Sequence, residues 1–199
     1  MSISPIIDRL IQAFQILPGV GPKTAQRMVL FLLQRNIDGA NRLASALDDA
    51  ILNVQECSAC RNLSESDLCN LCSDDRRDDG LLCVVEAVAD IIAIEQAGGF
   101  NGYYFVLNGR LSPIDGVGPD ELGLSQLVKR VNDLQPGEVI IATNPTVEGE
   151  ATANYIQQLL ENHVNSITRI AHGVPIGGEL EYSDGGTIVH ALQGRRTFV

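Results

Sequence analysis

Four cysteines lie close together in the sequence, in two Cys-x-x-Cys pairs. Cys57 and Cys60 form the first pair, and Cys69 and Cys72 form the second, after eight intervening residues. Thiolates are good zinc ligands, and two such pairs joined by a short loop can surround one ion at about 2.3 Å from each sulfur. Two disulfides would need an oxidising compartment, and a redox-active pair would explain only one of the motifs. The spacing therefore predicts one structural zinc ion per chain, with no ligand position left for a substrate.

A second group of candidate residues surrounds a glycine-rich turn near the N-terminus. Gly19 and Gly21 follow an amphipathic helix expected at about 5–17, and a second helix is expected to begin directly after them. The N–H groups at the start of a helix suit a phosphate, and Lys23 and Arg27 lie beside them on one helix face. This is the helix-hairpin-helix pattern, which holds the DNA backbone without reading bases. The alternative is an ordinary helical hairpin whose two cations are merely solvated.

Apolar runs of strand length alternate with helical segments in the second half of the chain. Buried strands are expected at 81–85, 103–107, 139–142 and 167–170, and helices at 88–97, 125–132 and 150–161. This alternation predicts an α/β fold with a parallel sheet and right-handed crossovers. Such sheets place their functional sites at the carboxyl ends of the strands.

Acidic residues occur where two of these strands end. Glu86 follows the first strand, and Glu148 and Glu150 follow the third, within the segment Asn-Pro-Thr-Val-Glu-Gly-Glu. The arrangement resembles the Toprim domain of topoisomerases and bacterial primases, in which a glutamate and an Asp-x-Asp pair hold Mg²⁺ for phosphoryl transfer. Asn144 and Thr146 replace that pair here, and their neutral oxygens are weak ligands for Mg²⁺. We therefore expect a Toprim domain without catalysis, whose glutamates either stabilise the following helix or form a docking surface for a basic partner.

Charge is distributed unevenly along the chain. The net charge of −11 over 199 residues at first argues against a nucleic-acid partner. Residues 1–53, however, carry five basic and four acidic side chains, a net of +1, whereas residues 54–80 and 81–199 have net charges of −4 and −8. An anionic partner would therefore meet the N-terminal part. The sequence contains no long apolar run and no signal-peptide pattern, so we expect a cytoplasmic protein without a membrane span.

These motifs occur in one order and are followed by Arg-Ile-Ala-His-Gly-Val-Pro-Ile-Gly-Gly-Glu-Leu-Glu. Together they resemble the RecR family of bacterial recombination mediators over essentially the whole chain. The resemblance implies a multi-part α/β protein with a helix-hairpin-helix DNA-binding unit at 1–53, a zinc finger at 54–78, a Toprim domain at 79–173, and a C-terminal segment at 174–199 that could contact another subunit.

The resemblance also implies a function and partners. It implies a role with RecO and RecF in recombinational DNA repair, aiding the loading of RecA onto single-stranded DNA covered by single-strand-binding protein. A ring-shaped homotetramer, or dimer of dimers, would encircle DNA, and the family's DNA-contacting cations fall on Lys23 and Arg27. RecO would dock on the Toprim face, which makes Glu86, Glu148 and Glu150 candidate contacts.

Other functions stay open at this point. A Mg²⁺-dependent Toprim nuclease or primase-like enzyme is the main alternative, and a scaffold that never binds DNA is another. A Walker-B-like carboxylate expected of the family would fall on Asp184, but without a Walker A motif we infer no ATP hydrolysis.

The loop at 111–120 is rich in glycine and proline, and nothing in it indicates a role. The apolar end at 194–199 suits a strand that completes this sheet or a neighbour's.

Overall fold

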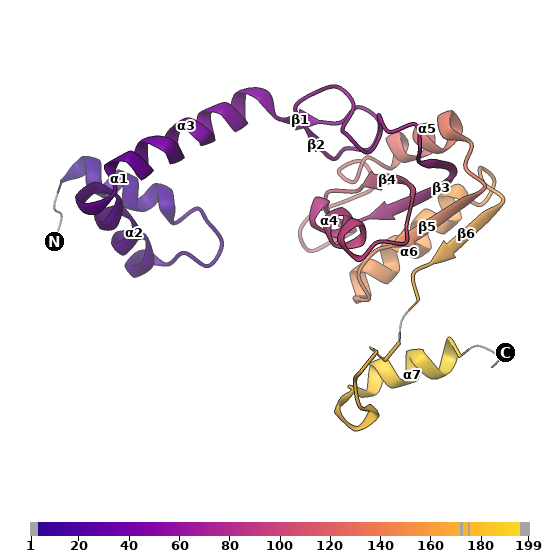
Figure 1. Ribbon diagram of the computed structural model, residues 1–199. Helices are drawn as coiled ribbons and strands as arrows, with labels where there is room; N and C mark the ends of the chain where they lie inside the picture. The colour runs from indigo at the N-terminus through magenta and orange to yellow at the C-terminus, as the bar shows by residue number, and fades with distance from the viewer. Residues whose placement is uncertain (1–3, 172, 175, 196–199) are drawn as a thin grey trace. The chain divides into compact units, whose positions relative to one another are not determined.

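The computed structural model describes residues 4–171, 173, 174 and 176–195. The chain divides into two compact units, Met1–Val54 and Gln55–Val199, both drawn in Figure 1. The strand expected at the end of the chain falls mainly on 196–199, which lie outside the described residues. None of the helices in the described ranges is both long and apolar enough to cross a membrane.

The first unit consists of three helices. They are α1 (Pro5–Phe14), α2 (Pro22–Arg35) and α3 (Ile37–Asn53). Its interior is small, because Ala25 and Val29 of α2 are its only fully buried side chains among the residues described. Asn36 joins α2 to α3, and its side chain accepts a hydrogen bond from the Gly39 N–H at 2.9 Å. This N-cap satisfies one of the N–H groups that a helix leaves unpaired at its start.

The second unit is built on a four-stranded parallel sheet with the strand order β4-β3-β5-β6. The strands are β3 (Asp78–Val85), β4 (Gly102–Val106), β5 (Glu138–Ala142) and β6 (Ser166–Arg169). Helix α4 (Val88–Ala97) covers one face of the sheet, and α5 (Leu124–Leu134) and α6 (Val147–Leu160) cover the other, as Figure 1 shows. The predicted parallel α/β sheet is therefore confirmed.

Strand β3 supplies the core on both faces of the sheet. Leu82 and Val84 belong to the cluster under α5 and α6, whereas Cys83 and Val85 belong to the cluster under α4. All four are at most 3% exposed, which explains why the strand appears in the sequence as a continuous apolar run. Cys83 is a core residue, and its burial raises the pKa of its thiol to about 12.

Short elements complete the second unit. Strands β1 (Gln55–Glu56) and β2 (Leu63–Ser64) form a small antiparallel pair, and a 3-10 helix η1 (Leu180–Tyr182) precedes α7 (Gly185–Gln193). Asp184 is the N-cap of α7, since its side chain accepts a hydrogen bond from the Thr187 N–H at 2.9 Å. The structure thus gives Asp184 a helix-capping role.

Candidate functional site

The four cysteine sulfurs converge at the start of the second unit. They belong to Cys57, Cys60, Cys69 and Cys72, and all lie within 4.8 Å of one another. The Cys60 and Cys69 sulfurs are 3.6 Å apart, far longer than the roughly 2.05 Å of a disulfide. Sulfurs at the corners of a tetrahedron around zinc would be about 3.8 Å apart, given Zn–S bonds of about 2.3 Å. The geometry fits a zinc ion.

Backbone N–H groups of the same segment point at the sulfurs. The Cys69 N–H donates to the Cys57 sulfur at 3.3 Å, and the Asn62 N–H donates to the Cys60 sulfur at 3.5 Å. Without a cation the sulfurs cannot all carry charge: the hydrogen bond between Cys60 and Cys69 raises the pKa of Cys60 and lowers that of Cys69. The four sulfurs and the N–H groups that point at them are therefore arranged for thiolates around a cation.

The cysteine segment is joined to the sheet. The Val106 N–H of edge strand β4 donates to the Cys60 carbonyl at 2.9 Å. The Arg61 guanidinium reaches the carbonyls of Leu107 and Leu122, at 3.3 and 2.6 Å. Arg61 adopts a left-handed backbone conformation with φ of 63°, which turns the chain toward these acceptors. No pattern in the sequence indicates this contact, because Arg61 and Leu122 are far apart along the chain.

The glycine turn lies at the surface of the first unit. Gly19 has a φ of +76°, a conformation that favours glycine, and Gly21 is the N-cap of α2. Lys23 lies in the first turn of α2 and Arg27 one turn later, and all four residues are exposed. Neither cation forms an ion pair within the described part of the chain. The unpaired N–H groups of the first helical turn and two cations are therefore gathered at one surface.

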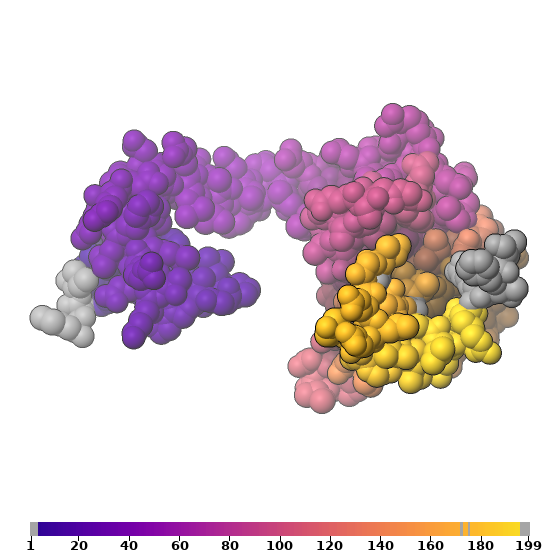
Figure 2. Space-filling view, turned by 60° about the horizontal axis from the view of Figure 1, so that its bottom comes forward, coloured from indigo at the N-terminus to yellow at the C-terminus, as the bar shows by residue number. Residues whose placement is uncertain are grey.

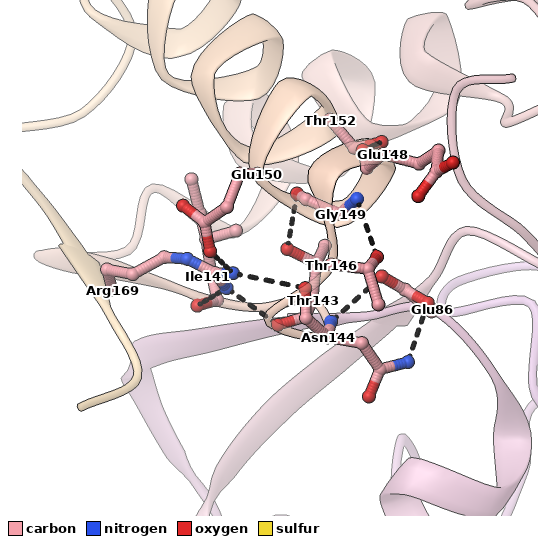
Figure 3. A network of polar contacts seen from close by, with 10 residues as sticks. All are labelled: Glu86, Ile141, Thr143, Asn144, Thr146, Glu148, Gly149, Glu150, Thr152 and Arg169. Atoms are coloured by element: carbon pink, nitrogen blue, oxygen red, sulfur yellow. Dashed lines mark hydrogen bonds and ion pairs between the residues drawn. The ribbon is translucent and has the colours of Figure 1, made fainter. Parts of the chain in front are cut away.

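The carboxylate of Glu86, which follows β3, accepts hydrogen bonds from Asn144. Glu86 is 6% exposed, and its two oxygens accept hydrogen bonds from the backbone N–H of Asn144 at 2.8 Å and from its side-chain amide at 2.7 Å (Figure 3). Thr146 is the N-cap of α6, and its hydroxyl accepts from the Gly149 N–H at 3.1 Å. Both positions of the expected Asp-x-Asp pair thus have structural roles.

Arg169, at the end of β6, neutralises part of the predicted acidic cluster. Arg169 pairs with Glu150 at 2.6 Å and donates to the carbonyls of Ile141 and Thr143, at 3.1 and 2.8 Å. The side chain of Glu148 points away from Glu150, on the opposite side of α6, as Figure 3 shows. Sequence reasoning missed Arg169, although a basic residue at the carboxyl end of the last strand was a usable signal.

Gly149 allows the start of α6 to approach Glu86 and Asn144. A Cβ atom at this position would lie 2.1 Å from the Asn144 carbonyl oxygen and 2.9 Å from a Glu86 oxygen. A Cβ carbon does not approach a non-bonded oxygen so closely, because it cannot form a hydrogen bond that would shorten the contact. The glycine of the Glu-Gly-Glu segment is therefore required by packing.

Comparisons with known proteins agree with this layout. The family models that match are the RecR helix-hairpin-helix at residues 7–51, the RecR four-cysteine zinc finger domain at 54–74, the Toprim domain at 80–171 and the RecR C-terminal region at 173–196. The zinc-finger match, together with the sulfur geometry, confirms the predicted structural zinc.

Two curated relatives match over almost their whole length. A protein named Recombination protein RecR from Stutzerimonas stutzeri is 58% identical over 196 residues, covering 98% of each chain. Another of the same name from Saccharophagus degradans is 55% identical over 193 residues, covering 97% of this chain and 98% of the relative. This chain therefore belongs to the RecR family of recombination proteins.

Proposed function

We propose that this chain is a cytoplasmic, non-catalytic recombination mediator that binds DNA and acts with RecO and RecF. In this role it aids the loading of RecA onto single-stranded DNA covered by single-strand-binding protein. The observation that carries the proposal is the match to proteins named Recombination protein RecR at 55–58% identity over nearly the whole chain. All four segments of the family occur in this chain, in order.

DNA binding is proposed for the glycine turn and the two cations beside it. The exposed positions of Gly19, Gly21, Lys23 and Arg27 support this, because phosphates are held by helix N-termini and by cations without reading sequence. The contact should therefore be insensitive to base sequence and sensitive to salt.

The test of DNA binding reverses both charges. Lys23→Glu combined with Arg27→Glu should weaken binding to a fluorescent oligonucleotide at least tenfold in an anisotropy titration, while circular dichroism stays unchanged. The matched control reverses Arg9 and Arg42, which lie on α1 and α3, and alters net charge equally. Equal binding by the two double variants would show that Lys23 and Arg27 are not the DNA contact, and no binding by the unaltered chain would favour a scaffold that never contacts DNA.

A homo-oligomer, proposed to be a ring-shaped tetramer or dimer of dimers, is supported by apolar side chains exposed on the first unit. Met28 and Phe31 of α2 are 39% and 54% exposed, and Leu47 and Ile51 of α3 are 54% and 77% exposed. Figure 2 gives a space-filling view of this unit, coloured by residue number. Exposed apolar side chains that lie one helical turn apart, as within each of these pairs, are typical of a contact with another protein chain.

The absence of catalysis is proposed from the residues at the carboxyl ends of β3 and β5. Glu86 is engaged by Asn144, and a neutral amide and hydroxyl stand where Mg²⁺ would need carboxylates. Purified protein incubated with plasmid and oligonucleotides across a range of Mg²⁺ and Mn²⁺ concentrations should leave both intact. Strand cleavage that disappears in a Glu86→Gln variant would establish the enzymatic alternative.

RecO docking is proposed for the Toprim face near the start of α6. Glu86 is buried and bonded to Asn144, so Glu148 and Glu150 are the more accessible members of the predicted set. Charge reversal at Glu148 should weaken binding of purified RecO in isothermal titration calorimetry, with DNA binding unchanged. Charge reversal at Glu161, at the exposed end of the same helix, is the matched control. The same RecO affinity in both variants would exclude Glu148 from the contact.

A further inference from the structure

Arg130 of α5 contacts the zinc site from outside the cysteine segment. Its Nη2 lies 3.8 Å from the Cys72 sulfur, and its guanidinium carbon lies 5.3 Å from the centre of the Tyr103 ring. Tyr103 in turn donates through its hydroxyl to the carbonyl of Asp74, just after the last cysteine, at 3.3 Å. The guanidinium is thus held by an aromatic ring of the sheet and directed at one ligand sulfur.

Cys72 differs from Cys57 and Cys60 in the donors that its sulfur accepts. Cys57 and Cys60 each accept a backbone N–H of the finger, at 3.3 and 3.5 Å. Cys72 is only half-buried, whereas the others are at most 4% exposed. In the described structure the Cys72 sulfur accepts a hydrogen bond from outside the finger, donated by the side chain of Arg130, 58 residues away.

The charge of Arg130 also needs a compensating partner. A guanidinium is always protonated, and the Nε of Arg130 is buried without a hydrogen-bond acceptor among the described residues. Even partial burial of a cation is costly unless negative charge lies close by. Four thiolates around one Zn²⁺ leave a net charge of about −2, and the Cys72 sulfur is where that charge meets the guanidinium.

We propose that Arg130 is a positioning residue of the zinc site, which stabilises the Cys72 thiolate and fastens the metal-bound finger to α5 of the Toprim domain. Partners of metal ligands typically change metal affinity by about 10-fold to 100-fold when they are removed. Zinc retention in this chain therefore depends on a residue of the neighbouring domain, although the four ligands all come from the finger.

The test measures zinc release from purified, zinc-loaded protein into a chromophoric chelator at fixed pH. Arg130→Met should release zinc about tenfold faster than the unaltered chain. Arg130→Lys, which retains the charge but loses the planar guanidinium, should release zinc at a rate between those of Arg130→Met and the unaltered chain. Lys129→Met, which removes an adjacent exposed charge on the same helix, should leave the rate unchanged.

A second readout separates a direct effect on the sulfur from a general loss of packing. Alkylation by iodoacetamide, followed by peptide mass spectrometry, should increase first at Cys72 in Arg130→Met, ahead of Cys57. If Arg130→Met and Arg130→Lys lower the melting temperature but release zinc at the unaltered rate, the residue acts only in packing and the proposal is wrong. Equal acceleration by Lys129→Met would likewise overturn it, because bulk charge would then be the cause.

Discussion

Glu86 would repel an aspartate at position 144, whereas the amide of Asn144 donates to one of its oxygens and the backbone N–H donates to the other. The sequence predicted this group, because Glu86, Asn144 and Thr146 follow strands that end at the same edge of a parallel sheet. It did not predict that Arg169 would pair with Glu150, because side-chain pairing across strands depends on rotamers and packing. The residue types were therefore predictable and their partners were not.

Gly149→Ala should destabilise the protein, because its Cβ would meet the Asn144 carbonyl oxygen at 2.1 Å. Overpacking of this kind costs about 1–3 kcal/mol in the free energy of unfolding, measured by urea denaturation. The control is Gly185→Ala in the first turn of α7, where an added Cβ meets nothing within 4 Å. That variant should be neutral or slightly stabilised, since alanine favours helix. Equal stability of Gly149→Ala and the unaltered protein would contradict the close approach.

At the scale of elements, strands and helices of the second unit were predictable, but the start of α6 was not. It was expected at 150 and lies at Val147, because Thr146 forms the N-cap. The zinc finger was predictable from cysteine spacing alone. Its attachment to β4 through Cys60 and Arg61 was not, since such contacts join segments that are distant in the sequence.

Helix α4 is fastened to the sheet by a polar group, which predicts a pH effect. Glu95 of α4 accepts a hydrogen bond from the Tyr104 hydroxyl at 2.6 Å and forms an ion pair with Arg77. Burial opposes ionisation of Glu95, but the hydrogen bonds from Tyr104 and Arg77 outweigh it and lower its pKa. A lowered folded-state pKa stabilises the protein above the unfolded value of about 4.3, and this contribution disappears as pH falls through the folded value.

Glu95→Gln should therefore lower the free energy of unfolding at pH 7 by about 1–3 kcal/mol. The difference from the unaltered chain should shrink as the pH falls through the folded-state pKa of Glu95, because Glu95 itself then becomes protonated. Urea denaturation at neutral and acidic pH gives the comparison, and Glu161→Gln at the exposed end of α6 is the control. A deficit that is the same at both pH values would show that the effect is not electrostatic.

Cys57→Ser should lose the zinc ion and destabilise the finger, because structural zinc contributes directly to folding. Metal analysis should give about one zinc per unaltered chain and much less in the variant, with a lower melting temperature. Cys83→Ala is the matched control: it removes a buried sulfur from the core under α4, so it should lower stability but retain zinc. A soluble Cys57→Ser protein of unaltered melting temperature would contradict a structural role for the metal.

At the scale of the whole molecule, charge and oligomerisation are linked. One hairpin with two cations on a chain of net charge −11 should bind DNA weakly. Several hairpins that meet one duplex would act together and raise the affinity without any new contact. Joint binding by several hairpins was not predictable from residue spacing or periodicity, because it depends on how copies of the chain assemble.

The salt dependence of binding measures how many hairpins engage. If about four to eight phosphates are neutralised, the slope of log affinity against log salt concentration should lie between about −4 and −7. A titration series over several salt concentrations measures the number of phosphates neutralised, and light scattering of the free protein measures its oligomeric state. A slope near −1 would exclude engagement by several protomers, and the mass of a single chain would exclude an oligomer that forms before DNA is bound.

The bond between the Cys60 carbonyl and the Val106 N–H has a consequence for chains made under metal starvation. Strand β4 lies at an edge of its sheet, and uncovered edges pair readily with strands of other molecules. The finger covers this edge only while it is folded, and zinc is needed for it to fold. Newly made chains that lack zinc would therefore leave the edge of β4 exposed to pairing with other molecules. Zinc starvation should then cause aggregation of the protein before any defect in repair.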